Sequence, residues 1–403
     1  MLVSCDLVDA TLLFDDTEEV FRVLQSITDG WSFAETSASD GAPALSVRRD
    51  GHGFEIMEEG WAPFREPSAV SAACSLVAIL LNRVVEDDPA FLALHAGAVA
   101  IGRQTIVFPS THRAGKSTLA AALALNGHKL VADDILPLDC RGAQACALAS
   151  GVAPRLRLPL PPSRDLRFRF LAWRWAGPDD GYYRYLRLPR WSRCRFAERF
   201  EIGVFVFLER DTSYREPGLC AVSKAHTMRV LLLQNFGTAA PPGTILDRVE
   251  TVSRQKPAFV MRYSDVGAAA CMLGNAFGRS ERPCELWARL DRAEPDLARV
   301  AGLDRDERVA SKPPERIVCH RDGVVARETE GSIFLADPGN GWIFALDPLG
   351  AAIWQLMDEP VSTREIATRL CQVFPDTTPE IIAADVDKLI GQLLENGLAI
   401  ETG

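Results

Sequence analysis

The feature that most constrains this chain is a short loop between an apolar, strand-like run and a helical run rich in alanine and leucine. The loop ends in Ala114-Gly115-Lys116-Ser117-Thr118. Residues 98–101 and 105–108, on either side of a turn at 102–104, predict two strands before the loop, and residues 117–126 predict a helix that stops at Gly127. Backbone N–H groups at such a helix start can bind polyphosphate, while a lysine reaches the terminal phosphate oxygens and a serine hydroxyl binds Mg²⁺. The pattern predicts an α/β domain that binds a nucleotide through Arg113, Ala114, Gly115, Lys116, Ser117 and Thr118.

The loop departs from the full phosphate-binding pattern at one position. The pattern G-x-x-x-x-G-K-[ST] has its first glycine where this chain has Ser110. Glycine is favoured there because its backbone adopts conformations that let the loop bend closely around phosphate. Two interpretations stay open: Arg113 or His112 adds charge near the terminal phosphate of an active variant, or the loop no longer binds nucleotide.

Ionisable residues lie on both sides of this loop in the sequence. A predicted buried strand at residues 129–132 ends in Asp133 and Asp134, and His95 stands one strand pair before the loop. These groups can converge with the loop at one edge of a sheet. Taken alone, paired acids at a strand end are often a helix cap or salt-bridge partners, and a single histidine is often part of a core.

Together the three motifs resemble the HPr serine kinase/phosphorylase family, which is related in fold to PEP carboxykinases. The matching residues, within a resemblance strongest over 92–140, are Leu94-His95-Ala96-Gly97, Gly115-Lys116-Ser117-Thr118 and Gly127-His128-Lys129-Leu130-Val131-Ala132-Asp133-Asp134. The resemblance implies a P-loop kinase domain of mixed α/β fold that uses ATP and Mg²⁺. It also implies that one of the two acids takes the proton from the acceptor hydroxyl, while the other helps to hold Mg²⁺ or positions the histidine. The expected catalytic residues are Asp133, Asp134 and His95.

The same resemblance suggests a set of metal ligands. Phe200-Glu201-Ile202-Gly203 is a loose echo of the family's later glutamate-rich signature. The expected Mg²⁺ ligands are therefore Ser117, Asp134 and Glu201. Whether phosphorylase activity accompanies the kinase stays open.

Residues 155–199 differ in composition from the rest of the chain. They hold twelve arginines and four acidic residues, interleaved with aromatic residues. Such a segment can border a nucleotide or dock an acidic substrate, it can stack on nucleic-acid bases, or it can be a solvated face whose aromatics belong to the core. The net charge of −10 for the whole chain gives no general affinity for nucleic acid or for an anionic membrane, and we expect neither as a partner.

The carboxy-terminal residues predict three short strands ending near Leu346 and then three helices. The helix starts are marked by Asp347-Pro348, by a capping box of Ser362 and Glu365, and by Thr377 or Thr378 with Pro379 and Glu380. From about residue 317 the chain resembles the PqqD family of small winged-helix-like modules that bind leader peptides. The matching residues are Ile333-Phe334-Leu335, Gly341-Trp342-Ile343-Phe344-Ala345-Leu346-Asp347, Gly350-Ala351-Ala352-Ile353-Trp354-Gln355-Leu356-Met357-Asp358 and the ending at 389–398.

The second resemblance implies that a leader peptide adds a strand to the sheet edge near residues 341–346 and packs against the last helix. The expected peptide-binding residues are Trp342, Ile343, Phe344, Leu346, Leu389 and Leu393. A winged helix can instead bind DNA, but residues 316–403 hold six basic and fourteen acidic residues, and phosphate binding needs the opposite sign.

These patterns predict an amino-terminal α/β subdomain at 1–90, a kinase-like domain at 91–280, a linker at 281–315 and a peptide-binding domain at 316–403. The apolar run at 69–85 contains polar residues and predicts a buried helix rather than a membrane span. Ten cysteines without ordered spacing indicate reduced thiols, and the absence of a signal sequence favours the cytoplasm. The family's ring-shaped assemblies leave a homo-oligomer open.

The sequence favours a kinase that phosphorylates a serine or threonine hydroxyl of a ribosomally made precursor peptide. Two other functions remain. One is a peptide-binding adaptor without catalysis, and the other is a small-molecule kinase whose peptide-binding domain serves regulation.

Overall fold

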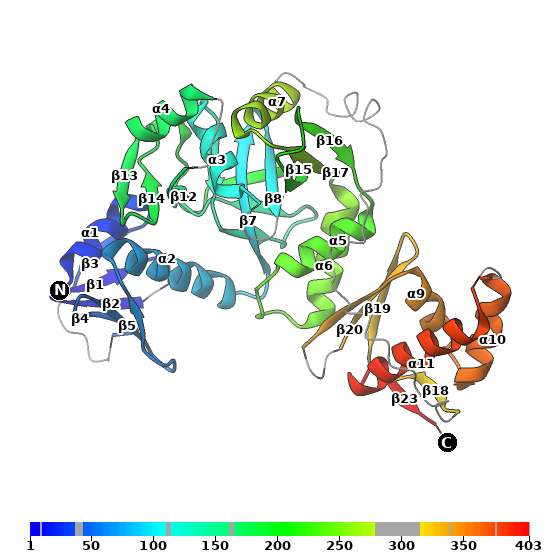
Figure 1. Cartoon of the computed structure of the whole chain (residues 1–403). Coiled ribbons are helices and arrows are strands. Elements are labelled where there is room, and N and C mark those ends of the chain that lie inside the picture. The colour runs from blue at the N-terminus through cyan, green and yellow to red at the C-terminus, as the bar shows by residue number, and fades with distance from the viewer. Residues whose placement is uncertain are drawn as a thin grey trace. The chain divides into compact units, whose positions relative to one another are not determined.

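The computed structural model describes residues 1–8, 10–36, 43–109, 114–160, 165–278, 315–337, 339, 341–374 and 377–402. These residues group into two units (Figure 1). The first holds Met1–Val222, Leu233–Ala240 and Val252–Ala293, and the second holds Ser223–Leu232, Pro241–Thr251 and Glu294–Gly403. Almost all of the predicted linker, 281–315, lies outside the described residues, as do residues 110–113 of the loop.

The first unit begins with a six-stranded sheet in the order β3-β1-β2-β4-β5-β6. Its strands are β1 (Leu2–Cys5), β2 (Ala10–Asp15), β3 (Phe33–Glu35), β4 (Leu45–Asp50), β5 (Gly53–Glu58) and β6 (Phe64–Glu66). Helices α1 (Glu18–Ile27) and α2 (Ala69–Glu86) share a buried core with it. Among the described helices, α2 alone is long and apolar enough to cross a membrane, a test that buried core helices also pass. The predicted helix at 69–85 is present, and Leu76 and Leu80 on its inner side are fully buried.

An eight-stranded sheet follows, with the order β11-β10-β7-β8-β15-β17-β16 and with β9 paired to β7. Its strands are β7 (Phe91–Ile101), β8 (Gln104–Pro109), β9 (Lys129–Ala132), β10 (Ile135–Asp139), β11 (Cys146–Leu148), β15 (Arg199–Arg210), β16 (Gly218–Ala221) and β17 (Ala258–Tyr263). Strand β11 pairs with β15 as well as with β10, so this ladder of strands closes on itself. Helices α3 (Lys116–Leu125) and α7 (Val266–Gly278) pack in its core. Most predicted elements here are present, but β10 was not predicted.

Three strands of this sheet run in the same direction and set the position of the loop. Strand β15 is parallel to both β8 and β17. The carboxyl ends of parallel strands meet at one edge of a sheet, where ligands bind in open α/β proteins. That edge carries the loop after β8, Arg210 at the end of β15 and Tyr263 at the end of β17.

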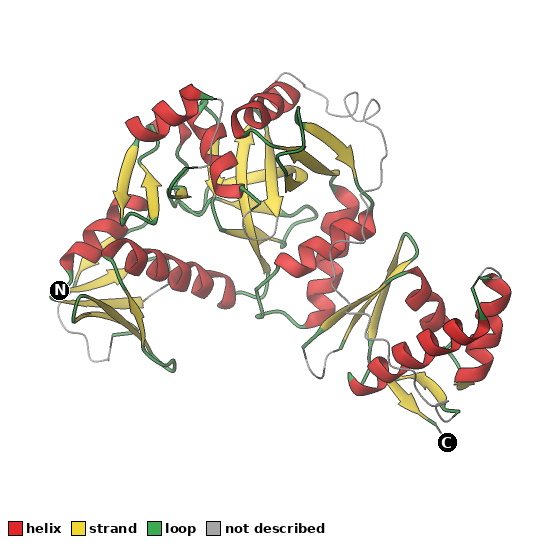
Figure 2. Ribbon diagram, in the orientation of Figure 1, coloured by secondary structure: helices red, strands yellow, loops and turns green. Residues whose placement is uncertain are grey.

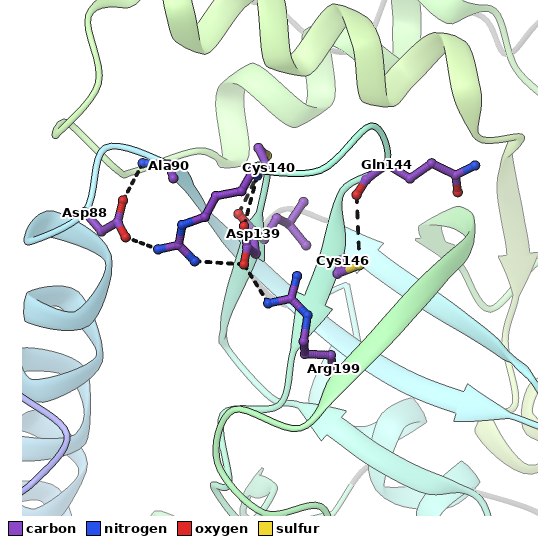
Figure 3. A network of polar contacts seen from close by, with 9 residues as sticks. Asp88, Ala90, Asp139, Cys140, Gln144, Cys146 and Arg199 are labelled. Atoms are coloured by element: carbon purple, nitrogen blue, oxygen red, sulfur yellow. Dashed lines mark hydrogen bonds and ion pairs between the residues drawn. The ribbon is translucent and has the colours of Figure 1, made fainter.

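A buried carboxylate links two strands in the closed part of the sheet (Figure 3). Asp139, the last residue of β10, accepts hydrogen bonds from Arg199 Nη1 at 2.7 Å and from the Arg141 backbone N–H at 3.0 Å. Arg141 also pairs with Asp88, which precedes β7. Burial raises the pKa of Asp139, but these donors outweigh it, so its pKa lies below the ordinary value. The ionised carboxylate therefore ties β10 to β15.

A smaller sheet occupies the arginine-rich segment. It has the order β12-β14-β13, formed by β12 (Arg155–Arg157), β13 (Ala176–Asp179) and β14 (Tyr183–Leu186). Helix α4 (Leu166–Arg174) buries Phe168 in the core and leaves Phe170 and Trp173 exposed, and the short η1 (Arg190–Ser192) follows β14. Helices α5 (Lys224–Gln234) and α6 (Pro242–Gln255) come after β16. The aromatic residues of the segment thus divide between the core and the surface.

The carboxy-terminal part forms two three-stranded sheets and three helices (Figure 2). One sheet has the order β19-β20-β21 and the other β22-β18-β23. The elements are β18 (Ile317–His320), β19 (Val325–Thr329), β20 (Ser332–Ala336), β21 (Ile343–Leu346), α9 (Pro348–Gln355), β22 (Val361–Ser362), α10 (Thr363–Val373), α11 (Pro379–Glu395) and β23 (Ala399–Glu401). Four strands therefore precede the helices, one more than the three predicted. The first of them, β18, belongs to the separate sheet that it forms with β22 and β23.

The caps of these helices agree with the sequence in part. Asp347 accepts from the Gly350 N–H at 2.8 Å and Ser362 accepts from the Glu365 N–H at 3.1 Å. The predicted capping box is half formed, because the Glu365 carboxylate pairs with Arg369 one turn later. At the start of α11, Thr378 makes no side-chain cap. Most of the stability of α11 must therefore come from its buried face.

Candidate functional site

A cavity of about 680 Å³ opens at the edge where the parallel strands end. Its walls come from β7, the start of α3, the β9–β10 junction, β12, β14 and the end of β15. The residues that line it are His95, Ala114, Gly115, Lys116, Ser117, Thr118, Asp134, Arg155, Arg157, Leu158, Pro159, Tyr183 and Arg210. The structure therefore brings the loop, the histidine and one of the two acids to the same space. Arg113 lies outside the described residues.

The start of α3 is fixed by a glycine and a buried tyrosine. Gly115 has a φ of 96°, in the left-handed region, and a Cβ there would lie 2.3 Å from Tyr263 Oη. The Tyr263 hydroxyl donates to the Ala114 carbonyl oxygen at 2.9 Å. Burial raises the pKa of Tyr263 to about 12, so this donor stays protonated at neutral pH. Glycine is required at 115 both for its backbone conformation and for the space that Tyr263 takes.

Lys116, the first residue of α3, is a buried cation beside the acid pair. Burial lowers the pKa of its ammonium group, and the negative charges of Asp134 and Asp133 oppose that shift. A buried cation at a helix amino terminus attracts anions, because the N–H groups of the first turn carry partial positive charge. This end of the cavity suits a polyphosphate.

The two acids lie where β9 and β10 share one neighbour. Ala132 of β9 pairs with Ala98 of β7, and Ile135 of β10 pairs with His95 of the same strand. The intervening Asp134 has a φ of 81°, a left-handed conformation that costs a side-chain-bearing residue about 1 kcal/mol or more. Its carbonyl oxygen accepts from the Ala96 N–H at 3.1 Å.

The carboxylate of Asp134 is held on both sides. Its Oδ1 lies 3.2 Å from His95 Nδ1, and its Oδ2 lies 3.5 Å from Arg155 Nη2. The side chain is still 45% exposed, toward the cavity that it lines. Such a carboxylate is oriented and also accessible, as a group that accepts a proton from a substrate must be.

Asp133 is buried and differs from its neighbour. Its Oδ2 accepts from the Arg155 backbone N–H at 2.9 Å, whereas no partner for Oδ1 is found among the described residues. Burial, and then the charge of Asp134, raises the pKa of Asp133 to about 6, against hydrogen bonds from Arg155 and Ser117. A buried oxygen without a donor is costly, and a cation beside it would remove that cost.

The donors at this point fit Mg²⁺. A serine hydroxyl and one or two carboxylates are its usual protein ligands at nucleotide sites, where water and phosphate oxygens complete the shell. Of the predicted ligands, Ser117 and Asp134 line the cavity, and the buried Asp133, which was not predicted as a ligand, lies beside Ser117. Within the described ranges no group of three or more histidine, cysteine, aspartate or glutamate side chains has metal-site geometry.

The predicted metal ligand Glu201 is not part of this cavity. It lies near the amino end of β15, opposite Cys146 of β11, and its carboxylate is 3.5 Å from Lys256 Nζ and 69% exposed. The cavity is reached by Arg210, at the other end of the same strand. At about 3.3 Å per residue, the two positions are roughly 30 Å apart. Glu201 was predicted from a loose match to a sequence motif. Such a match does not indicate at which end of its strand the residue lies.

Six cavity residues were not predicted individually: Arg155, Arg157, Leu158, Pro159, Tyr183 and Arg210. All except Arg210 belong to the arginine-rich segment, and one interpretation of that segment was that it borders the nucleotide. The structure places them at the cavity, on β12, on β14 and in the residues that follow β12. The sequence contained no signal that selects them among twelve arginines.

We expect Asp133→Asn to stabilise the nucleotide-free protein at neutral pH. Because the folded-state pKa is raised from 3.8 to about 6, the contribution of Asp133 to stability is fully present below pH 3.8 and is lost as the pH rises through 6. Relative to the wild type, the variant should gain about 1–3 kcal/mol in free energy of unfolding at pH 7 and nothing near pH 4. Denaturant unfolding at both pH values measures the difference.

Asp139→Asn is the matched control for this experiment. The pKa of that buried acid is lowered, so its ionised form stabilises the fold and the variant should be less stable at pH 7. If Asp133→Asn also destabilises the protein at pH 7, the ionised Asp133 carboxylate is more strongly stabilised by its neighbours than its raised pKa indicates, and the prediction is wrong.

The edge of the carboxy-terminal sheet offers a second surface. The Asp337 N–H donates to the Trp342 carbonyl oxygen at 3.0 Å, so the polar groups of alternate residues from Trp342 point toward β20. The N–H and C=O groups of Ile343 and Ala345 then point away from β20, on the open side of an edge strand. That side can pair with an added strand.

The side chains expected to bind a peptide divide into two groups. Trp342 is 66% exposed, and Ile343, Phe344 and Leu389 are partly exposed. Leu346 and Leu393 belong to the buried core. Gly350 lies against both Leu346 and Leu389, which places α11 beside the end of β21. A peptide on this edge would contact the exposed and partly exposed side chains. The two buried leucines, as part of the core, would support that surface.

Residues 332–399 match the PqqD family, described as coenzyme PQQ synthesis protein D. The match spans β20, β21, the three helices and the first residue of β23, and so includes the whole open edge. We call this part the PqqD-like domain.

Comparison with other proteins adds two solved structures. No curated protein matches the chain. A structure of "TbiB1 in Complex with the TbiA(beta) Leader Peptide" is 22% identical, covering 21% of this chain and 98% of that one, with a TM-score of 0.20. The Hpr(Ser) kinase/phosphatase from Coxiella burnetii is 11% identical, covering 45% of this chain and 91% of that one, with a TM-score of 0.25. At these scores neither likeness bears on the function of this chain.

Proposed function

We propose that this chain is an ATP- and Mg²⁺-dependent kinase that phosphorylates a serine or threonine hydroxyl of a ribosomally made precursor peptide, and that its PqqD-like domain holds the leader of that peptide. One observation carries the proposal: Lys116, Ser117 and Asp134 line one cavity at the start of α3, and the buried Asp133 lies next to them. The cytoplasm, where thiols stay reduced, is the compartment we propose for this activity.

The nucleotide would be bound by the amino terminus of α3. The N–H groups of the first helical turn and the Lys116 ammonium group face the cavity and would hold the phosphates of ATP. Mg²⁺, held by Ser117 and Asp133, would neutralise charge on the phosphate oxygens. Asp133 must be ionised for this role, and the nearby cation would favour that form.

Asp134 would take the proton of the acceptor. It lines the cavity, and His95 and Arg155 orient its carboxylate. The acceptor oxygen forms a bond to the terminal phosphorus while the bond from that phosphorus to the bridging oxygen of ADP breaks, and the hydroxyl proton moves to the Asp134 carboxylate. Catalysis of this kind depends mainly on positioning and on charge neutralisation.

The leader peptide would add a strand beside β21. Ile343 and Ala345 would supply the main-chain hydrogen bonds, and Trp342, Phe344 and Leu389 would supply apolar contacts. Tethering the peptide to the chain that phosphorylates it would raise the local concentration of the acceptor to the millimolar range.

Trp342→Ala is expected to lower the affinity for the leader peptide by about 2 kcal/mol, or roughly 30-fold, because an exposed tryptophan at a binding edge is a typical hot spot. Fluorescence anisotropy with a labelled synthetic leader peptide measures the change. Trp61→Ala, which removes a 75% exposed tryptophan of the first unit, should leave the affinity unchanged.

Ala345→Pro tests the backbone part of the same interaction. Proline removes one outward N–H and is tolerated at a solvent-facing position of an edge strand. Unchanged leader affinity in both Trp342→Ala and Ala345→Pro would rule out this edge as the binding site.

The function itself is tested with ATP labelled at its terminal phosphate and the full-length precursor. We expect label on the peptide, and much slower labelling of a core peptide that lacks the leader. If calorimetry detects neither ATP nor ADP binding, the chain is a peptide-binding adaptor. If the precursor takes no label although ATP binds, the acceptor belongs to another class of molecule.

A further inference from the structure

Arg155 is the one residue of β12 that contacts both acids of the cavity. Its backbone N–H donates to Asp133 Oδ2 at 2.9 Å, and its Nη2 lies 3.5 Å from Asp134 Oδ2. These contacts join residues that are 22 and 21 positions apart in the sequence. One residue therefore anchors the acid pair from outside the closed sheet.

The guanidinium group of Arg155 contacts two side chains, Cys74 and Tyr183, which we call its seat. Its Nη1 contacts Cys74 Sγ on α2, and its central carbon lies 4.6 Å from the centre of the Tyr183 ring on β14. Tyr183 stands diagonally across from it, since Arg155 pairs with Tyr185 in the ladder. Burial raises the pKa of the Cys74 thiol and holds that of Tyr185 well above its ordinary value, so both groups are neutral.

The seat does not neutralise the positive charge of Arg155, so this charge can act on the Asp134 carboxylate. The thiol and the aromatic ring hold the guanidinium plane in place without neutralising it. The Asp134 carboxylate is then fixed by two cations or donors, His95 at one oxygen and Arg155 at the other. With one of these partners removed, a carboxylate that is 45% exposed is free to turn about its Cβ–Cγ bond.

We propose that Arg155 is a positioning residue, which sets the direction of the Asp134 carboxylate toward the acceptor, and that Tyr183 holds the guanidinium group for this purpose. The inference rests on the proposed kinase function. It assigns Arg155 no contact with the reacting atoms, and so it separates this arginine from a phosphate-binding one.

The test uses the full chain with MgATP as the probe and water as the acceptor. Arg155→Met keeps the backbone N–H and the length of the side chain but removes the charge. We expect kcat for ATP hydrolysis to fall about 10–100-fold, as for a misplaced catalytic group, while the KM and the Kd for MgATP change less than about threefold. Arg155→Lys should recover part of the loss, because an ammonium group still pairs with Asp134 but lacks the planar fork.

The seat is tested by a pair of tyrosine variants. Tyr183→Leu removes the ring and should lose about as much kcat as Arg155→Lys, whereas Tyr183→Phe keeps the ring and should lose less than Tyr183→Leu. Arg184→Met is the control: this arginine also lies on the small sheet but pairs with Asp179 at 3.0 Å, and its loss should leave kcat unchanged.

Two outcomes overturn the inference. One is a wild-type kcat in Arg155→Met, and the other is a loss of MgATP affinity with kcat unchanged, which would make Arg155 a phosphate ligand. If the wild type transfers phosphate neither to water nor to the precursor, the proposed function fails, and a crystal structure of Arg155→Met still decides the inference. The positioning role requires that the 3.2 Å contact between His95 and Asp134 is lost or displaced there, and an unaltered contact contradicts it.

Discussion

Replacing Lys116 with methionine is expected to lower the rate of phosphoryl transfer by about 10²–10³-fold, the loss typical of removing one preorganised charge from a transition state. Lys116 is buried at the start of α3, where the negative charges of Asp134 and Asp133 oppose the fall in its pKa caused by burial. Methionine keeps most of the apolar stem and removes only the ammonium group. Transfer of labelled phosphate to the precursor measures the rate, and calorimetry measures the weaker binding of MgATP.

Lys129→Met is the matched control for Lys116→Met. Lys129 begins β9, and its exposed ammonium group lies 4.0 Å from Glu198. Its replacement should leave both rate and nucleotide affinity unchanged. Equal rates in the two variants would mean that the charge at the start of α3 has no part in catalysis, and the chain would then be best described as a peptide-binding adaptor.

Replacing Asp134 with asparagine should lower kcat by about 10²–10⁴-fold, the usual contribution of a positioned general base. Asparagine preserves the shape of the side chain and its contacts near His95 and Arg155, but it cannot accept the proton. The Kd for MgATP should change little, because the acid beside Ser117 is Asp133. Single-turnover kinetics at saturating ATP separates the chemical step from binding.

Asp179→Asn serves as the comparison for Asp134→Asn. Asp179 ends β13 and pairs with Arg184, and neither residue lines the cavity, so its loss should not affect kcat. A kcat for Asp134→Asn within threefold of the wild type would assign the proton to another acceptor, with Asp133 as the next candidate.

The elements around the nucleotide cavity were largely predictable because they follow local patterns. The helix from Lys116 and the strands before and after it show in runs of alanine, leucine, valine and isoleucine with glycine at the ends. The grouping of His95 with the acids was predictable because His95 lies within a strand, and the acids follow another strand, that are close in the sequence. Their pairing with one strand, β7, then brings them together.

The remaining cavity residues depend on contacts between distant parts of the chain. Tyr263 reaches Ala114 across 149 positions, and Cys74 reaches Arg155 across 81. No periodicity or spacing records which strand will lie beside which. The sequence misplaced Glu201 at the cavity for the same reason. Its distance from the cavity follows from the direction of β15 and from the pairing of β15 with β11.

The β9–β10 junction allows no change of length. Both strands pair with β7, in registers set at Ala132 and Ile135, so two residues must span the gap. An inserted or deleted residue would slip β10 by one position and turn the side chains that follow to the opposite face of the sheet. Variants selected for new acceptors should therefore tolerate substitutions around the junction but no insertions within it, and chimeras with other proteins should join elsewhere.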